Sequence, residues 1–474
     1  MQIENELPIV SPGNTPASVT DAIAGVPLTS ALRTPRFWYV GFGLAFLGVM
    51  AFFLAVTELF VRGVGIWGIN IPVAWAFAII NLVWWIGIGH AGTLISAILL
   101  LLRQEWRTSI NRFAEAMTLF AVAQAAMFPI LHLGRPWLFF WLLPYPNTQW
   151  LWPQFRSPLV WDAFAITTYA LVSIVFWYLG LVPDLATLRD RAKSKFGRIS
   201  YGIFALGWRN SAKQWHHYVR TYWLLAALAT PLVISVHSII GMDFAYAQIP
   251  GWHSTIFPPY FVAGAIFSGF AMVLTLTIPL RKWYHFEGFI TARHLDNMAK
   301  VMLAVGLVVG YGYLMEIFTP LYGGDPFEIS TMLDRFTGGY APFYIALLAI
   351  NIGVTQTLWF KSVRSHPWVL WVVAITINVG MWLERFIIIV QSLHTDFLPS
   401  SWHMYWPTTW DILLFAGTIG LFLALLFMFV RLLPSISIFE MGELVTHHNK
   451  DHASTDEGSA RGDHGKPQTI RPAG

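Results

Sequence analysis

Apolar residues in this chain fall into ten long runs that polar segments separate. Each run is close to or above the ~20 residues with which a helix crosses the hydrocarbon core of a bilayer. Lipid offers no hydrogen-bond partner to a backbone amide, so each run is predicted to be an α-helix. The predicted spans are residues 37–60, 73–102, 109–131, 158–182, 220–246, 257–280, 297–322, 340–360, 366–392 and 408–433. The pattern therefore predicts an all-α integral membrane protein with ten transmembrane helices.

The spans divide the chain into three segments. Residues 1–35 form a polar N-terminal segment, rich in Pro, Ser and Thr, without the apolar run of a cleavable signal peptide. Residues 36–434 form the transmembrane domain. Residues 435–474 form a polar tail that is expected to be disordered. Its histidines are expected to belong to a solvated terminus rather than to a metal site. They are His447, His448, His452 and His464.

A weak internal sequence repeat predicts how the spans are grouped. Pro72 opens a span that ends at Arg103, and Pro258 opens one that ends at Arg281. A short basic loop and a further helix follow in both cases. Duplicated bundles are common in membrane proteins. We therefore expect spans 2–5 and 6–9 to form two four-helix bundles, flanked by spans 1 and 10.

The cations predict the orientation of the chain. Lys and Arg gather in alternate connections, and residues 183–219 alone carry seven of them, whereas residues 247–257 and 393–407 carry none. The positive-inside rule places basic loops in the cytoplasm, so both termini are expected there. The sequence pI of about 9.2 is accounted for by these cations against anionic lipid headgroups and requires no nucleic acid.

The chain contains no cysteine, which limits the redox chemistry that it can hold. Iron–sulfur clusters need thiolate ligands and disulfides need sulfur, so neither is expected. The embedded histidines His90, His132 and His237 lie on three predicted helices without a paired pattern, which disfavours a haem. If the protein handles electrons, a partner must carry them away.

Two ionisable residues are predicted to meet near the outer surface. His132 ends the third span, and Asp162 lies about one turn into the fourth, so both have a similar depth. A histidine beside a carboxylate makes a proton acceptor whose pKa lies near working pH. We therefore interpret this pair as functional rather than as a structural ion pair.

Other ionisable residues reach the same half of the membrane. His237 and Asp243 lie in the last turns of the fifth span but are six residues apart, so they point to different faces. Glu316 lies near the outer end of the seventh span, and Glu384 and Arg385 lie at a similar depth in the ninth. The structural alternative is that Arg385 neutralises Glu316 or Asp243 and locks the helices together.

The chemistry of this region suits a quinol. A quinol loses two protons as it gives up two electrons, and a pocket with proton acceptors and flat apolar walls fits it. His90 and Glu115, deeper in the membrane, could extend a proton route inward, although a buried core histidine is the more common role for His90. Aromatic residues crowd the outer zone, most of them as interfacial belt residues. They are Trp137, Phe139, Phe140, Trp141, Trp150, Trp152 and Trp161.

Five short runs together resemble one family of membrane proteins. They are GHAGTLIS at 89–96, RFAEAM at 112–117, HLGRPW at 132–137, SPLVWD at 157–162 and FPPYFVAGAIF at 257–267. They resemble the NrfD-like polysulfide reductase membrane subunits. Among these the chain is most similar to the quinol-binding subunit of bacterial alternative complex III, ActC. The paralogous ActF subunit of that complex is the nearest competing identity.

The resemblance implies a subunit of a quinol-oxidising respiratory complex that is inactive alone and lies in the bacterial inner membrane. It implies menaquinol or ubiquinol as substrate, with no haem or iron–sulfur cluster in this chain. The implied partners are a periplasmic iron–sulfur subunit, multihaem cytochrome c subunits, a second NrfD-like membrane subunit and a terminal oxidase.

The resemblance also assigns roles to residues. The quinol pocket is expected at the periplasmic side of the first bundle, with His132 and Asp162 as the catalytic pair. The implied quinol-binding residues are His132, Arg135, Trp137, Asp162, His237, Asp243 and Arg385. The expected proton relay comprises His90, Glu115 and Glu316.

Two other functions remain open from the sequence. A secondary transporter or ion translocator would also show an outer cluster and an inner relay, but it usually has broken spans at a midplane site. Interruptions rich in glycine are scarce here apart from residues 306–312. A cofactor-free membrane anchor would bind no ligand at all.

Overall fold

The computed structural model describes residues 8–29, 34–142, 158–396 and 398–449. These residues form helices and no strands, and ten helical segments are long and apolar enough to cross a membrane. The predicted fold class is confirmed. The ten are α2 (Arg36–Arg62), α3 to α4 (Phe77–Leu101), α5 (Asn111–Leu131), α6 (Pro158–Arg191), α8 (Ala212–Ala245), α9 (Phe257–Trp283), α10 (Ala292–Gly323), α12 to η7 (Ala341–Trp359), α14 to η8 (Pro367–Gln391) and α15 (Thr409–Leu432).

Shorter helices connect or cover the spans. They are α1 (Pro16–Leu28), η2 (Val64–Ile66), η4 (Glu105–Ser109), η5 (Pro136–Leu142), α7 (Lys195–Phe204), α11 (Pro326–Thr337), α13 (Lys361–Ser365) and η9 (Pro399–Ser401). We call the end of the helices that carries the basic connections, including α7 and the segment after α15, the basic end. The other end, where α5 stops and α6 begins, is the cavity end.

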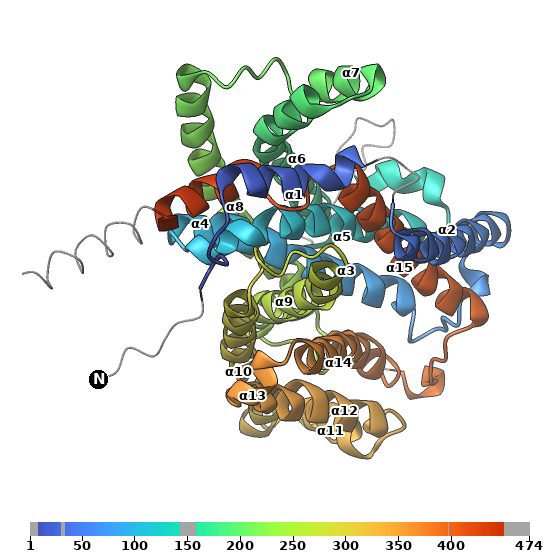
Figure 1. The fold of residues 1–474 in the computed structure, drawn as a ribbon. Helices are drawn as coiled ribbons and strands as arrows, with labels where there is room; N and C mark the ends of the chain where they lie inside the picture. Colours follow the sequence, from blue (N-terminus) through green and yellow to red (C-terminus); the bar gives the residue numbers. More distant parts are fainter. Residues whose placement is uncertain (1–7, 30–33, 143–157, 397, 450–474) are drawn as a thin grey trace, which may run out of the picture.

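The spans pack as two four-helix groups and one pair. Helices α3, α5, α6 and α8 form the first bundle, and α9, α10, α12 and α14 form the second. Helices α3 and α9 pack against each other and join the two bundles, while α2 and α15 form a separate pair. Figure 1 shows this pair at one edge of the molecule and the second bundle at another.

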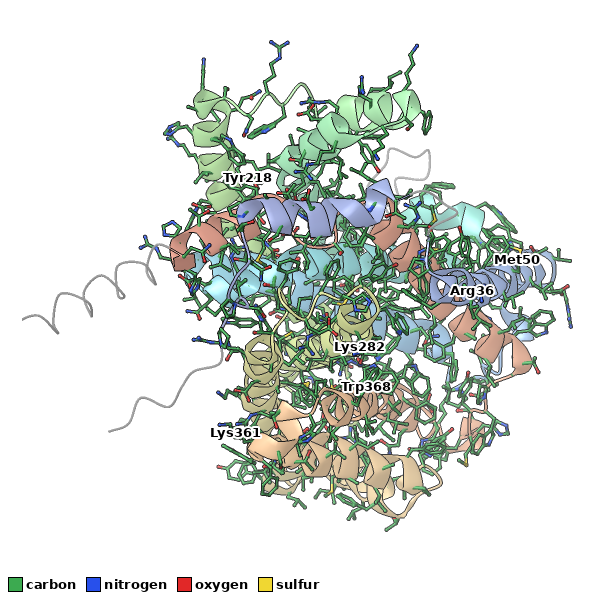
Figure 2. All side chains as sticks on the ribbon, viewed as in Figure 1. Arg36, Met50, Tyr218, Lys282, Lys361 and Trp368 are labelled. Atoms are coloured by element: carbon green, nitrogen blue, oxygen red, sulfur yellow. The ribbon has the colours of Figure 1, made fainter. Side chains whose placement is uncertain are left out.

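Burial explains the different compositions of these helices. The most apolar window of α3 is 94% buried, which explains why α3 is apolar on all sides. The corresponding window of α2 is only 28% buried, and its large apolar side chains face outward. Figure 2 shows Met50 of α2 at the outer edge of the molecule. Such a face suits lipid rather than water.

Three spans contain a π-helical turn that the sequence did not predict. They are η3 (Leu94–Ile98) within the second span, η6 (Ala349–Val354) within the eighth and η8 (Ile387–Gln391) within the ninth. A π-turn inserts one residue per turn and redirects the side chains that follow. None of the three turns lies in a glycine-rich stretch. A search for glycine-rich interruptions therefore could not have found them.

Two connecting segments are more ordered than the sequence predicted. The basic connection 183–219 is largely helical, because α6 continues to Arg191, α7 follows, and α8 begins at Ala212. Residues 438–449 are also helical, so the expectation of disorder is wrong for this part of the tail. Met441 and Val445 are buried in the core and hold this helix in place. His452 and His464 lie outside the described residues.

The α2–α15 pair depends on a close approach of two glycines. A Cβ atom added to Gly48 would lie 2.7 Å from the Gly420 Cα atom, which is closer than real Cβ contacts. We predict that Gly48→Val separates the helices and costs about 1–3 kcal/mol of stability, as overpacking does elsewhere. Thermal unfolding of the detergent-purified protein measures this change.

Gly43 is the matched control on the same helix. No heavy atom lies within 4 Å of a Cβ added there. Gly43→Val should therefore leave the melting temperature nearly unchanged. Equal melting temperatures for Gly48→Val and the unmodified protein would show that the two helices do not depend on this contact.

Candidate functional site

A cavity of about 500 Å³ opens at the cavity end of the first bundle. Its walls are mostly apolar and come from α3, α5, α6 and α8, with Trp75 and Phe244 among the aromatic residues. Three ionisable side chains face this space, namely His132, Asp162 and Asp243. His132 and Asp162 therefore line the same cavity, as the sequence predicted.

His132 lies directly after α5 and is held by both backbone and ring contacts. Its amide donates to the Phe128 carbonyl oxygen at 2.8 Å, and its ring meets Trp75 edge-on, with 6.4 Å between ring centroids. Burial lowers the pKa of His132 below its ordinary value of 6.5. A neutral imidazole at physiological pH can accept a proton.

Asp162 and Asp243 form a carboxyl pair at the cavity wall. Asp162 comes from the first turns of α6 and Asp243 from the last turns of α8, and their side chains lie in hydrogen-bonding contact. Two carboxylates side by side in an apolar wall repel each other, so a proton shared between them stabilises the pair. The Oδ1 atom of each is buried and makes no hydrogen bond within the described residues. The pair can therefore take up one further proton.

Four residues predicted to bind quinol lie outside this lining, namely Arg135, Trp137, His237 and Arg385. Arg135 is exposed beyond the end of α5, and the Trp137 side chain is 56% exposed. Phe139 does line the cavity, and Trp161 packs against Tyr246 with 6.4 Å between ring centroids. Trp150 and Trp152, and the side chain of Trp141, lie outside the described residues.

His237 meets His90 instead of the cavity. The two Nδ1 atoms are 2.9 Å apart in the buried core between α3 and α8. The expectation of unpaired embedded histidines is therefore wrong. The sequence missed this pair because the partners are 147 residues apart and their facing depends on how two helices pack.

Glu115 lies in a buried network at the basic end. Arg112 pairs with Glu115 at 3.1 Å and with Asp184 of α6 at 3.6 Å, and the Tyr222 hydroxyl donates to Glu115 at 3.0 Å. Arg112 and Glu115 are three residues apart on one helix, so their pairing could have been predicted from the sequence. The contacts of Asp184 and Tyr222 could not be predicted in this way, because these residues come from other helices.

The C-terminal helix completes this network. Glu440 accepts a hydrogen bond from the Asn111 side chain at 2.8 Å and pairs with Arg107 at 3.2 Å. The Asp184 carboxylate accepts from the backbone amide of Phe439, at the start of the same helix, at 3.3 Å. Residues after the last span therefore close the basic end of the first bundle.

Glu316 and Arg385 belong to the second bundle. Glu316 pairs with Arg335 of α11 at 2.8 Å, whereas Arg385 pairs with Glu384 and lies 4.7 Å above the Phe261 ring. The direct partner of Glu316 is thus Arg335, and that of Arg385 is its neighbour Glu384. Arg335 lies on the connecting helix α11, outside the predicted spans. The prediction from depth covered only ionisable residues within spans, so it could not include this pair.

The model of the family "Polysulphide reductase, NrfD" matches residues 67–397. This range covers the eight helices of the two bundles and leaves out α2 and α15.

A curated relative from Halobacterium salinarum bears the name of a dimethyl sulfoxide reductase membrane subunit. It is 25% identical over 272 residues, which cover 54% of this chain and 55% of the relative. The chain thus spans about half the length of the curated relative that it matches. Because the family match covers well over half of the chain, the protein belongs to the NrfD family of polysulphide reductase proteins.

Proposed function

We propose that this chain is the quinol-binding membrane subunit of a respiratory oxidoreductase of the alternative complex III type. Menaquinol or ubiquinol is oxidised in the cavity at the end of the first bundle. The observation that carries this proposal is the convergence of His132 and the Asp162–Asp243 pair on one apolar cavity.

The three groups provide the proton balance that quinol oxidation needs. Oxidation to the quinone releases two protons and two electrons. The neutral imidazole of His132 takes one proton, and the carboxyl pair, which already holds one, takes the other. The chain contains no cysteine, so the electrons pass to an iron–sulfur partner subunit.

The charge distribution supports a periplasmic position for the cavity. The cavity lies at the end of the helices opposite the basic connections, which the positive-inside rule places in the cytoplasm. Both termini are then cytoplasmic, and protons leave toward the periplasm. The iron–sulfur subunit docks over the cavity end, and multihaem cytochrome c subunits, a second NrfD-like subunit and a terminal oxidase follow in the complex.

A proton relay through the first bundle extends this proposal. The His90–His237 pair lies in the buried core of that bundle, and Glu115 lies at its basic end. Embedded ionisable groups at successive depths often mark proton routes. Glu316 was expected in the same relay, but it is paired with Arg335 in the second bundle and does not belong to this route.

Ion translocation is the second candidate function. The π-turns η6 and η8 interrupt two spans of the second bundle, and a cavity of about 240 Å³ adjoins the Glu316–Arg335 pair. Interrupted spans beside buried charges are typical of transporters. The cavity of the first bundle is larger and has mostly apolar walls, which favours quinol chemistry.

Replacing His132 tests the proposed acceptor. We predict that His132→Phe lowers quinol oxidation by the purified complex about 10²-fold or more, because acid–base groups typically contribute that much. The pKa of His132 is lowered by burial, so protonation disables the acceptor only below pH 6.5. The loss of activity on that acid side should disappear in the variant. Quinol-dependent reduction of an added electron acceptor, followed against pH, measures both effects.

His403→Phe is the matched control for this experiment. His403 is an exposed histidine at the same end of the molecule and does not line the cavity. Its replacement should leave turnover and pH profile unchanged. Full turnover of an assembled His132→Phe complex would remove His132 from the mechanism.

Glu115→Gln tests the relay separately from quinol binding. The substitution keeps the size of the side chain but removes the carboxyl group that can gain and lose a proton. We predict fewer protons translocated per electron in sealed vesicles, with the KM for quinol nearly unchanged, because the cavity is at the other end of the bundle. Glu443→Gln, an exposed carboxylate on the C-terminal helix, is the control. Normal acidification at normal turnover in Glu115→Gln vesicles would make Glu115 a packing residue.

A further inference from the structure

Helix α7 presents an apolar stripe that no other described part of the chain covers. No residue of α7 is buried. Phe196, Ile199 and Ile203 are spaced three and four residues apart and so lie on one side of the helix. Their exposed fractions are 82%, 52% and 66%. We call these three residues the apolar stripe of α7.

Cations lie beside this stripe. Lys193 lies just before α7 and Lys195 is its first residue, whereas Arg198 lies on the far side of the helix from Phe196; all three are exposed. Helix α7 is therefore amphipathic and basic. A helix of this kind, with large apolar side chains on one face and Lys or Arg near it, is typical of segments that lie in the membrane interface.

Two hydrogen bonds place the end of α7 at the level where spans leave the hydrocarbon. The Tyr201 hydroxyl donates to the carbonyl oxygen of Leu432, the last residue of α15, at 3.1 Å. The Tyr178 hydroxyl donates to the Phe204 carbonyl oxygen at 2.7 Å. Tyr178 follows the start of α6 by the ~20 residues that cross a bilayer.

The packing of α7 agrees with this level. It contacts α6 and lies at the edge of the molecule, away from the second bundle (Figure 1). Tyr201 packs against the core, whereas the stripe points outward. The exposed stripe thus lies beside the bilayer surface at the end of the molecule that carries most of the loop cations.

We propose that α7 lies in the membrane interface at the basic end. Its apolar stripe is inserted among lipid acyl chains, and Lys193 and Lys195 contact anionic phospholipid headgroups. Lipid is the occupant because the cations match anionic headgroups and the hydrogen bonds hold the end of α7 at the bilayer boundary. This binding is independent of quinol oxidation.

The absence of cysteine makes a direct test possible. A single cysteine can carry a spin label at one chosen position of the full-length chain. F196C puts the label on the stripe, and R198C puts it about 200° around the helix. Both variants are reconstituted into vesicles of phosphatidylethanolamine and phosphatidylglycerol. Accessibility is measured with oxygen, which enters lipid, and with a water-soluble nickel chelate.

We expect oxygen to relax the label in F196C more strongly than nickel does, and the reverse in R198C. If nickel reaches both labels equally well, α7 stands in water and the proposal is wrong. If neither reagent reaches the label in F196C, protein rather than lipid covers the stripe, which also overturns the proposal.

The role of lipid charge needs a second comparison. In vesicles without phosphatidylglycerol, nickel accessibility of F196C should rise about twofold or more, because each cation near an anionic surface contributes to binding. Adding K193Q and K195Q to F196C should give the same rise in anionic vesicles. If both changes leave the accessibility unaltered, the cations do not contact headgroups.

Discussion

Placing a charge inside a bilayer costs about 3 kcal/mol on insertion scales, and this cost organises the interior of the protein. Arg112 is held by Glu115 and Asp184, and Arg335 is held by Glu316. Such pairs need both partners, because removing one leaves a buried charge uncompensated. Each network therefore joins several helices and fixes their relative positions.

The cavity end of the first bundle follows a different rule. His132 and the Asp162–Asp243 pair face an apolar space of about 500 Å³, and no Lys or Arg of the described residues lines it. Neutral or proton-sharing groups avoid the cost of a buried charge while they can still accept protons. This contrast separates groups that hold the helices together from groups that face a ligand-sized space.

Sequence alone predicted what depends on length, hydropathy and local spacing. The ten spans, and the placing of His132 and Asp162 at the same end of their helices, follow from where each apolar run begins and ends. Depth does not determine which way a side chain faces. His237 has nearly the depth of Asp243 but meets His90, and Arg385 pairs with its neighbour Glu384. Glu440 was missed because the tail around it was expected to be polar and disordered, although Met441 and Val445 anchor it.

Segments outside the family match contribute to the same interior. The match ends at residue 397, yet Glu440 closes the network of Arg107 and Asn111 at the basic end. Helices α2 and α15 also lie outside the match and pack as a pair beside the bundles. The two bundles therefore form the shared part of the family, and the flanking segments of this chain seal one end of it.

The position of bound quinone in the purified complex tests the account most directly. A cryo-electron microscopy structure of the complex, prepared with quinone, should show the headgroup in the cavity of the first bundle. One headgroup oxygen is predicted within about 3 Å of His132 and the other near the Asp162–Asp243 pair, at hydrogen-bonding distance. A quinone bound elsewhere, with this cavity filled by lipid, would contradict the account.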